Sequence, residues 1–323
     1  MIVLGIESTA HTFGVGVFDG TKQKVLANVR DTFTTSVGGL IPKDVAMHHK
    51  QVQSDIFEKA LHDARVSIED IGLIAYSSSP GLAPSLIVGR DFAVDLAKKY
   101  NKKLLGVNHI MAHLEIGLFT TGAKDPIFLF CSGANTQVIA HDGGRYRVFG
   151  EALSIALGNA LDKFARSIGL GFPGGPKIEE LAKKGKYVEL PYKVKGMDVD
   201  FSGIVTRAMD LYKKGVAKED LCFSLQETCF AMLIEVAERA VAHCEKNEVL
   251  LIGGVAANKR FSEMLTLMSH ARGVKAYTVP MEYAGDQGAM IAYQGWLERD
   301  REQIIFDIDP RLRVDEIETF WKK

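Results

Sequence analysis

Two histidines in the stretch NHIMAH have the clearest capacity for chemistry in this chain. His109 and His113 are four residues apart, so on a helix they share one face and lie about one turn from each other. That spacing is typical of a helical metal clamp. The residue after His109 is Ile110, whereas a zinc-protease motif requires Glu at this place. The pair predicts a metal site, although two ordinary helix residues would show the same spacing, and it argues against a protease.

A metal held by two histidines needs a third ligand, and Asp286 in AGDQGAMIA is the best candidate. It follows a glycine and stands at the predicted start of a helix, where it could instead serve only as the N-cap. Two His and one carboxylate are the facial triad that suits ferrous iron. A similar set with an open position also serves catalytic zinc, so the residues do not decide between iron and zinc.

Four glycine-rich or small-residue turns predict a phosphate site. They are ESTAHT, CSGANTQ, GFPGGPKIEE and GGVAANKR. Backbone N–H groups can approach an anion closely in such turns, above all at the start of a helix. No GxxxxGK[ST] occurs, and GVGVFDG is not followed by a helix, so neither a P-loop nor a dinucleotide fingerprint is present.

The elements that would position these residues repeat along the chain. Three strands are predicted in IVLGIE, FGVGVFDG and KVLANVRDTF, followed by alternating helices and strands up to the helix that Asn108 would cap. Three strands are predicted again in PIFLFCSGANTQVIAHDGGRYRVFGE, and mainly helices follow, ending with AGDQGAMIAYQGWLERD. The repeated layout predicts an α/β protein of two related halves that face each other across a cleft.

Composition narrows the class of protein. The 323 residues include 39 Lys and Arg against 40 Asp and Glu, a net charge of -1, so a dedicated nucleic-acid binder is not indicated. The four cysteines form no CxxC pair and predict reduced thiols of an intracellular, cytoplasmic protein. The apolar N-terminus is short and Glu7 interrupts it, so it predicts a strand, and no run is long enough to predict a membrane span.

Several motifs in one order resemble the archaeal branch of the tRNA threonylcarbamoyladenosine transferase family, formerly described as O-sialoglycoprotein endopeptidases, whose archaeal members belong to the KEOPS complex. The motifs are GVNHIMAHLEIG, SGANTQVIA, GNALDKFAR, GFPGGPKIEELA, LPYKVKGMDVDFSG, SLQET, GGVAAN and GDQGAMIAY. The resemblance covers nearly the whole chain. It implies the actin-like, sugar-kinase-like fold, with two ribonuclease-H-like halves around a central nucleotide and metal cleft. The expected halves are residues 1–124 and 125–294, with the tail 295–323 packing back on the first.

The resemblance also implies site residues. The metal ligands, which would act in catalysis through the metal, map onto His109, His113 and Asp286. Nucleotide contacts map onto Phe130, Cys131, Ser132, Gly133, Ala134, Asp162, Gly175, Glu179 and Asn258. The expected cofactors are one divalent metal per chain, with Fe²⁺ favoured over Zn²⁺, and an adenine nucleotide, either ATP or the AMP part of the intermediate.

The sequence departs from the archaeal pattern at a few positions. Phe130 stands where relatives commonly have a Tyr that could add an oxygen near the metal, and Phe has no ligand atom. Ala134 replaces a glycine and adds a methyl group where a phosphate would approach. Gln287 replaces an Asn and Ser8 a Gly. None of these changes removes an expected metal ligand.

The resemblance implies transfer of a threonylcarbamoyl group from threonylcarbamoyl-AMP to the exocyclic amine of the adenine next to the anticodon, in tRNAs that read codons beginning with A. Expected partners are tRNA and KEOPS subunits, including a small kinase-like ATPase and a small dimerising subunit, with no membrane. Two alternatives are a small-molecule kinase, in which Asp162 would accept a hydroxyl proton, and a non-catalytic, nucleotide-switched assembly subunit. The basic run from Lys177 to Lys195 could contact RNA, but an ordinary solvated face is the more common reason for such a run.

Overall fold

The computed structural model describes residues 1–35, 40–301 and 307–322. The chain divides into two compact units. Unit 1 is built from the chain up to Thr34, from Gly38–Ile116 and from Asp286–Lys323, and unit 2 from Gly117–Gly285 with a short piece near residue 35. Helix α3, His109–Thr121, runs from the first unit into the second.

Unit 1 is built on a mixed five-stranded sheet in the order β3-β2-β1-β4-β5. Its strands are β1 Ile2–Glu7, β2 Thr12–Asp19, β3 Lys24–Thr32, β4 Ile71–Ser79 and β5 Lys103–Asn108. β1, β2 and β3 are antiparallel neighbours, whereas β1, β4 and β5 run parallel. The carboxyl ends of β1, β4 and β5 therefore meet at one edge of the sheet, which is where open α/β sheets place their sites.

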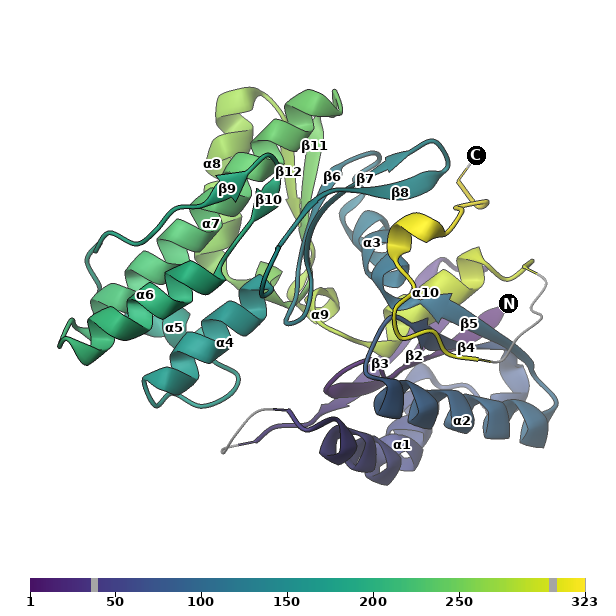
Figure 1. The fold of residues 1–323 in the computed structure, drawn as a ribbon. Helices are drawn as coiled ribbons and strands as arrows, with labels where there is room; N and C mark the ends of the chain where they lie inside the picture. The colour runs from purple at the N-terminus through teal and green to yellow at the C-terminus, as the bar shows by residue number, and fades with distance from the viewer. Residues whose placement is uncertain (36–39, 302–306, 323) are drawn as a thin grey trace. The chain divides into compact units, whose positions relative to one another are not determined.

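Helices cover both faces of this sheet (Figure 1). α1 Pro42–Ala64 and α2 Ala83–Tyr100 share a core with Leu4 and Ile6 of β1. On the opposite face, α10 Gly288–Leu297 approaches the strands at two glycines. A methyl group at Gly5 or Gly16 would lie 2.1 Å from a backbone nitrogen of α10, so only glycine permits this contact.

Unit 2 repeats the sheet plan in the order β12-β11-β6-β7-β8. Its strands are β6 Ile127–Cys131, β7 Thr136–Asp142, β8 Arg145–Glu151, β11 Glu248–Ile252 and β12 Lys275–Thr278, and a small separate sheet pairs β9 Val194–Lys195 with β10 Asp198–Val199. Its helices are α4 Leu157–Ser167, α5 Gly175–Ala182, α6 Ser202–Lys213, α7 Lys218–His243, α8 Lys259–Arg272 and α9 Met281–Ala284. Both sheets begin with three antiparallel strands and continue with parallel ones, which confirms the predicted repeat of the α/β layout.

The units end at different residues from the halves expected from the sequence. The sequence placed residues up to 294 in the second half, but α10 packs on β1 and β2 because Gly5 and Gly16 admit its backbone. The described part of the tail 295–323 also contacts unit 1, since Trp321 Nε1 donates to Glu115 Oε1 at 3.1 Å. Residues 302–306 and 323 of that tail lie outside the described residues, and the borders of the two actin-like halves stay a prediction.

Two further expectations bear on the class of protein. All four cysteines are free thiols. None of the helices in the described ranges combines the length and the apolar character that crossing a bilayer requires.

Candidate metal centre and nucleotide loops

The two histidines of the predicted clamp lie together at the start of α3. β5 ends at Asn108, whose Oδ1 accepts the backbone N–H groups of Ile110 at 2.9 Å and Met111 at 3.1 Å. This confirms Asn108 as the cap of the helix. The rings of His109 and His113 are 4.6 Å apart between centroids and nearly perpendicular, so their Nε2 atoms can face a common point.

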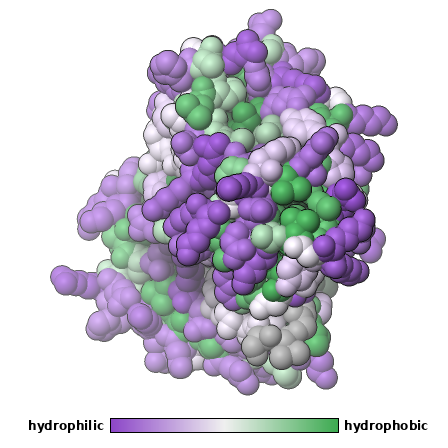
Figure 2. All heavy atoms as spheres, turned by 90° about the vertical axis from the view of Figure 1, so that its left-hand side faces the viewer, coloured by the Kyte–Doolittle hydropathy of each residue, from purple (hydrophilic) through white to green (hydrophobic). Residues whose placement is uncertain are grey.

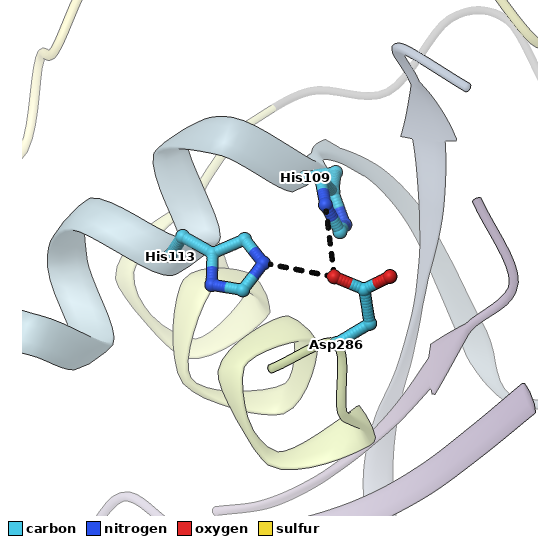
Figure 3. A group of neighbouring side chains, drawn as sticks. All are labelled: His109, His113 and Asp286. Carbon is cyan, nitrogen blue, oxygen red and sulfur yellow. Dashed lines mark hydrogen bonds and ion pairs between the residues drawn. The ribbon is translucent and has the colours of Figure 1, made fainter. Parts of the chain in front are cut away.

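Asp286 lies two residues before the start of α10 and contacts both histidines. Its Oδ1 lies 3.2 Å from His113 Nε2 and 3.6 Å from His109 Nε2, and both contacts end on the same carboxylate oxygen (Figure 3). The neighbouring Gln287 caps α10, because its Oε1 accepts the N–H of Met290 at 2.9 Å. The capping role considered for Asp286 thus falls to Gln287, and the aspartate side chain is available as a ligand.

The donor set fits a transition-metal ion. One ligand atom from each of His109, His113 and Asp286 lies within 4.8 Å of the others, and both histidines are buried. Ligand atoms about 2.1 Å from an ion are roughly 3 to 3.5 Å apart in tetrahedral or octahedral geometry, which is close to the two nitrogen–oxygen distances here. All three residues belong to unit 1, so the group forms within one compact body.

Glu7 and Thr9 also contact this centre, and neither was predicted from the sequence. Glu7 is the last residue of β1 and is fully buried, and its Oε2 lies 2.9 Å from His109 Nδ1. Thr9 Oγ1 lies 3.2 Å from the same nitrogen. The sequence feature that could have identified Glu7 is a carboxylate at the carboxyl end of an otherwise apolar strand.

The charges of the centre depend on one another. Burial alone would lower the pKa of His109, but the neighbouring Glu7 and Asp286 raise it to about 9. For Asp286, burial opposes ionisation, yet the hydrogen bond from His113 and the two imidazoles hold the pKa of the carboxyl well below its usual range. Burial and the nearby His109 lower the pKa of His113. Asp286 therefore stays an ionised ligand, and His113 favours the neutral form that can bind a metal.

In unit 2, the loop after β6 presents few free backbone donors. The N–H of Ser132 donates to Asn135 O at 2.8 Å, and the N–H of Asn135 donates to Ser132 Oγ at 3.0 Å. The carbonyls of Ser132 and Gly133 accept N–H groups at the start of α4, from Gly158 and Asn159. Within the described chain, the N–H groups of Gly133 and Ala134 make no hydrogen bond, and both residues are exposed.

Three other nucleotide candidates hold helix starts in place, and a fourth, Gly175, has an open backbone. Asp162 Oδ1 accepts the N–H of Gly174 at 2.6 Å, which fixes the turn that begins α5. Glu179 Oε1 accepts the N–H of Lys259 at 2.9 Å, at the start of α8. Asn258 caps α8 through Phe261 N–H and donates to Gln226 Oε1. Gly175 has open space where a side chain would stand, so a ligand can approach its backbone closely.

Phe130 and Cys131 have fully buried side chains in β6. They support the loop that follows, and their side chains are not surfaces for a nucleotide. The structure thus places the candidates around the starts of α4, α5 and α8, with the two residues at the end of β6 beneath the first of these loops.

The fold and the site define the class of protein: a mixed α/β chain of the actin-like, sugar-kinase-like type that carries a His-His-Asp group able to hold a metal. A crystal structure of HypF from T. kodakarensis is similar with a TM-score of 0.63 at 16% identity, covering 92% of this chain and 47% of that chain. The activator of the 2-hydroxyisocaproyl-CoA dehydratase from Clostridium difficile, solved with bound ADPNP, is similar with a TM-score of 0.55 at 13% identity, covering 94% of this chain and 100% of that one. Likeness at such low identity shows the fold alone.

Sequence comparison shows the family. The family model described as tRNA N6-adenosine threonylcarbamoyltransferase matches residues 24–293. Proteins named tRNA N6-adenosine threonylcarbamoyltransferase from Thermococcus sibiricus and Thermococcus kodakarensis are each 54% identical over 99% of this chain and 100% of their own length. A longer relative from Thermoplasma acidophilum, named a probable bifunctional tRNA threonylcarbamoyladenosine biosynthesis protein, is 47% identical, and the match covers 61% of it. The chain belongs to the tRNA N6-adenosine threonylcarbamoyltransferase family, as its motifs predicted.

Proposed function

We propose that this chain transfers the threonylcarbamoyl group from threonylcarbamoyl-AMP to the exocyclic amine of the adenine next to the anticodon, in tRNAs that read codons beginning with A. The observation that carries the proposal is 54% identity, along the full length of both chains, to proteins named for this activity. The matched region also includes His109 and His113.

The proposed cofactor is one divalent metal ion per chain, held by His109, His113 and Asp286. Two neutral imidazoles and one carboxylate favour ferrous iron, with zinc as the alternative. When bound, such an ion supplies Lewis-acid chemistry that polarises a carbonyl or phosphoryl oxygen. The protein's part is to keep the two histidines buried and the aspartate ionised, while metal binding displaces the proton that the raised pKa of His109 retains in the metal-free protein.

The proposed nucleotide contacts are backbone donors of unit 2. Gly133, Ala134 and Gly175 have N–H groups that make no hydrogen bond within the described chain, and they are the best donors for a phosphate. Asp162, Glu179 and Asn258 would act mainly by holding the helix starts in place, since their side chains already accept backbone N–H groups. The loop itself would be held in shape by the residues at its start, Phe130, Cys131 and Ser132.

In the proposed step, the adenine amine forms a bond to the carbonyl carbon of the threonylcarbamoyl group. The bond from that carbon to the phosphate oxygen breaks, AMP leaves with the electron pair, and the amine loses one proton. The proton lost by the amine passes to the leaving phosphate or to solvent, and because the amine itself is the nucleophile, no water has to be activated. This explains why Ile110 can stand where a metalloprotease requires its general-base Glu.

The proposed partners are tRNA and the companion subunits of a KEOPS complex, including a small kinase-like ATPase and a small dimerising subunit, in the cytoplasm. The net charge of -1 supports dependence on partners, because affinity for RNA comes largely from cations that neutralise phosphates. The face in Figure 2 is mostly hydrophilic, with apolar residues in scattered patches. The longer bifunctional relative supports a second activity working beside this one.

The test is reconstitution with defined substrates. Unmodified tRNA and threonylcarbamoyl-AMP are incubated with the chain, alone and with the companion subunits, and the digested nucleosides are analysed by mass spectrometry. We expect threonylcarbamoyladenosine in both samples, with a much faster rate and a steeper salt dependence of tRNA binding in the complex. If no modified nucleoside is detected under any condition, the proposed transfer is wrong. Transfer of the γ-phosphate of ATP to a small molecule would support the kinase alternative instead.

A further inference from the structure

We propose that Glu7 is a positioning residue that orients the imidazole of His109, keeping Nδ1–H on its carboxylate so that Nε2 is the nitrogen that gives up its proton to a metal. The proposal rests on the metal centre of the proposed function and adds a residue to it. Glu7 Oε2 lies 2.9 Å from His109 Nδ1, and both side chains are buried. Histidine ligands of metals commonly donate their second ring N–H to a carboxylate, which fixes both the ring orientation and the tautomer.

The carboxylate of Glu7 is itself held in place. The backbone N–H of Thr9 donates to Glu7 Oε1 at 2.6 Å, and the Thr9 hydroxyl donates to the same oxygen. One carboxylate oxygen is therefore engaged by Thr9, and the other faces His109. A carboxylate with this arrangement has little freedom to rotate away from the imidazole.

The turn that carries Thr9 is tied to two neighbouring elements of unit 1. The N–H of Ser8 donates to Ser77 Oγ of β4 at 3.0 Å. The carbonyl of Thr9 accepts the N–H of Leu82, just before α2, at 2.8 Å. These bonds to β4 and to the residue before α2 fix the position of Glu7, and Glu7 in turn orients His109 through the contact between Oε2 and Nδ1.

The direction of that hydrogen bond decides which nitrogen can bind a metal. A carboxylate only accepts, so Nδ1 of His109 must be the donor. In the neutral imidazole the other nitrogen, Nε2, then carries the lone pair, and it lies 3.6 Å from Asp286 Oδ1. Without Glu7, the ring could turn or take the other tautomer, and a proton would occupy the ligand position.

If Glu7 had a purely structural role, it would only join β1 to α3 by a hydrogen bond. A buried carboxylate is a costly way to join two elements, because transfer of a charged group out of water requires compensation by several hydrogen bonds. Glu248 offers a matched comparison in unit 2. It is 7% exposed and accepts the N–H groups of Lys124 at 2.7 Å and Asp125 at 3.1 Å, with no metal-ligand candidate in the described chain beside it.

The experiment measures Co²⁺ binding to metal-free protein by its visible absorption, in competition with a chelator of known affinity. For Glu7→Gln we expect Co²⁺ affinity to fall 10- to 100-fold, with a changed visible spectrum because the ligand field at His109 changes. Thr9→Val keeps the carboxylate and the backbone bond to it but removes the hydroxyl that contacts both Glu7 Oε1 and His109 Nδ1, so we expect a smaller loss of about threefold and the same direction of spectral change. Glu248→Gln should lower thermal stability but leave Co²⁺ affinity and spectrum unchanged.

Wild-type Co²⁺ affinity and spectrum in both Glu7→Gln and Thr9→Val would overturn the proposal, as would an equal loss of affinity in Glu248→Gln. Thr9→Val keeps the test decisive if Glu7→Gln does not fold. Failure of the proposed function is seen separately. If the reconstituted wild type makes no threonylcarbamoyladenosine while Glu7→Gln still weakens Co²⁺ binding, the positioning role stands and the transfer does not.

Discussion

The candidate metal centre of unit 1 and the candidate nucleotide loops of unit 2 are built in opposite ways. The metal centre consists of side chains: His109, His113 and Asp286 converge in a buried place, and Glu7 and Thr9 hold one of them from behind. The nucleotide loops consist of backbone, with exposed Gly133 and Ala134 and the open space at Gly175. The three side chains of the first site are thus already in contact, whereas the second is a surface of backbone donors whose side chains hold the loops.

The largest effect is expected from removing the side chains of the preformed site. His109→Ala combined with His113→Ala should lower bound metal from close to one per chain to near zero and reduce the rate of threonylcarbamoyl transfer at least a hundredfold, because Lewis-acid stabilisation accounts for several kcal/mol. Elemental analysis and the nucleoside assay measure the two effects. His62→Ala combined with His270→Ala is the control, since both residues are exposed. Equal metal content in the two double variants would remove the basis for the metal centre.

A second effect concerns another buried histidine of unit 1. His49 is fully buried, its ring packs on Phe13, and its Nε2–H donates to Ala10 O at 2.9 Å. Burial lowers its pKa from 6.5 to about 4. The folded state therefore holds a neutral imidazole, and the stability it contributes is present above pH 6.5 and is lost as the pH falls from 6.5 towards 4. The loss is about 3 kcal/mol when complete.

Urea unfolding at pH 7 and at several pH values down to 4 measures this loss. In His49→Gln the fall in the free energy of unfolding should be smaller than in wild type by up to about 3 kcal/mol. In His270→Gln, which changes an exposed histidine of unit 2, it should match wild type. An identical pH profile for wild type and His49→Gln would show that His49 is not kept neutral by burial.

A third effect is expected where the open backbone surface is blocked. Gly175→Val places a side chain in space that no protein atom occupies within 4 Å, so the fold should survive by circular dichroism. If a phosphate approaches Gly175, the added side chain should weaken adenine-nucleotide binding at least tenfold in calorimetry. Gly203→Val is the matched control, because Gly203 also faces open space but belongs to α6, which carries none of the nucleotide candidates. Unchanged affinity in Gly175→Val would place the nucleotide elsewhere.

The smallest effect is expected at Ala134, which replaces the glycine common in the family. Ala134→Gly removes one methyl group from an exposed loop residue, and the greater freedom of glycine, a cost of roughly 0.5–1 kcal/mol, opposes any gain. Adenine-nucleotide affinity should change less than about threefold. A tenfold change in calorimetry would mean that the methyl group decides the geometry of the phosphate site, and the loop could no longer be described by its backbone donors alone.

The metal centre could be predicted from the sequence because its signals are local. The spacing of His109 and His113 already defines one helix face, and Asn108 marks the start of that helix. Asp286 stands out as a carboxylate after a glycine at a helix start. Glu7 could not be assigned from its neighbours, because its role depends on β1, β4 and β5 running parallel and ending at one edge of the sheet.

The fold was predictable to a similar extent. The long periodic segments, such as α1 and α7, and the two sets of three strands follow from apolar patterning. The two-residue strands β9 and β10 carry too little pattern to be seen, and β12, with its partly exposed residues, depends on pairing with β11. The compact unit to which α10 belongs could not be predicted, because it depends on close packing of the α10 backbone against Gly5 and Gly16.

Anomalous diffraction from crystals of the metal-replete protein, collected at the iron and zinc absorption edges, is the most direct test of the metal centre. It locates the metal and identifies it in the same experiment. We predict one strong peak per chain within bonding distance of His109 Nε2, His113 Nε2 and an oxygen of Asp286, with the larger signal at the iron edge. A metal-replete crystal without a peak at these three residues, or with its only peak at another cluster, would show that they do not hold the metal.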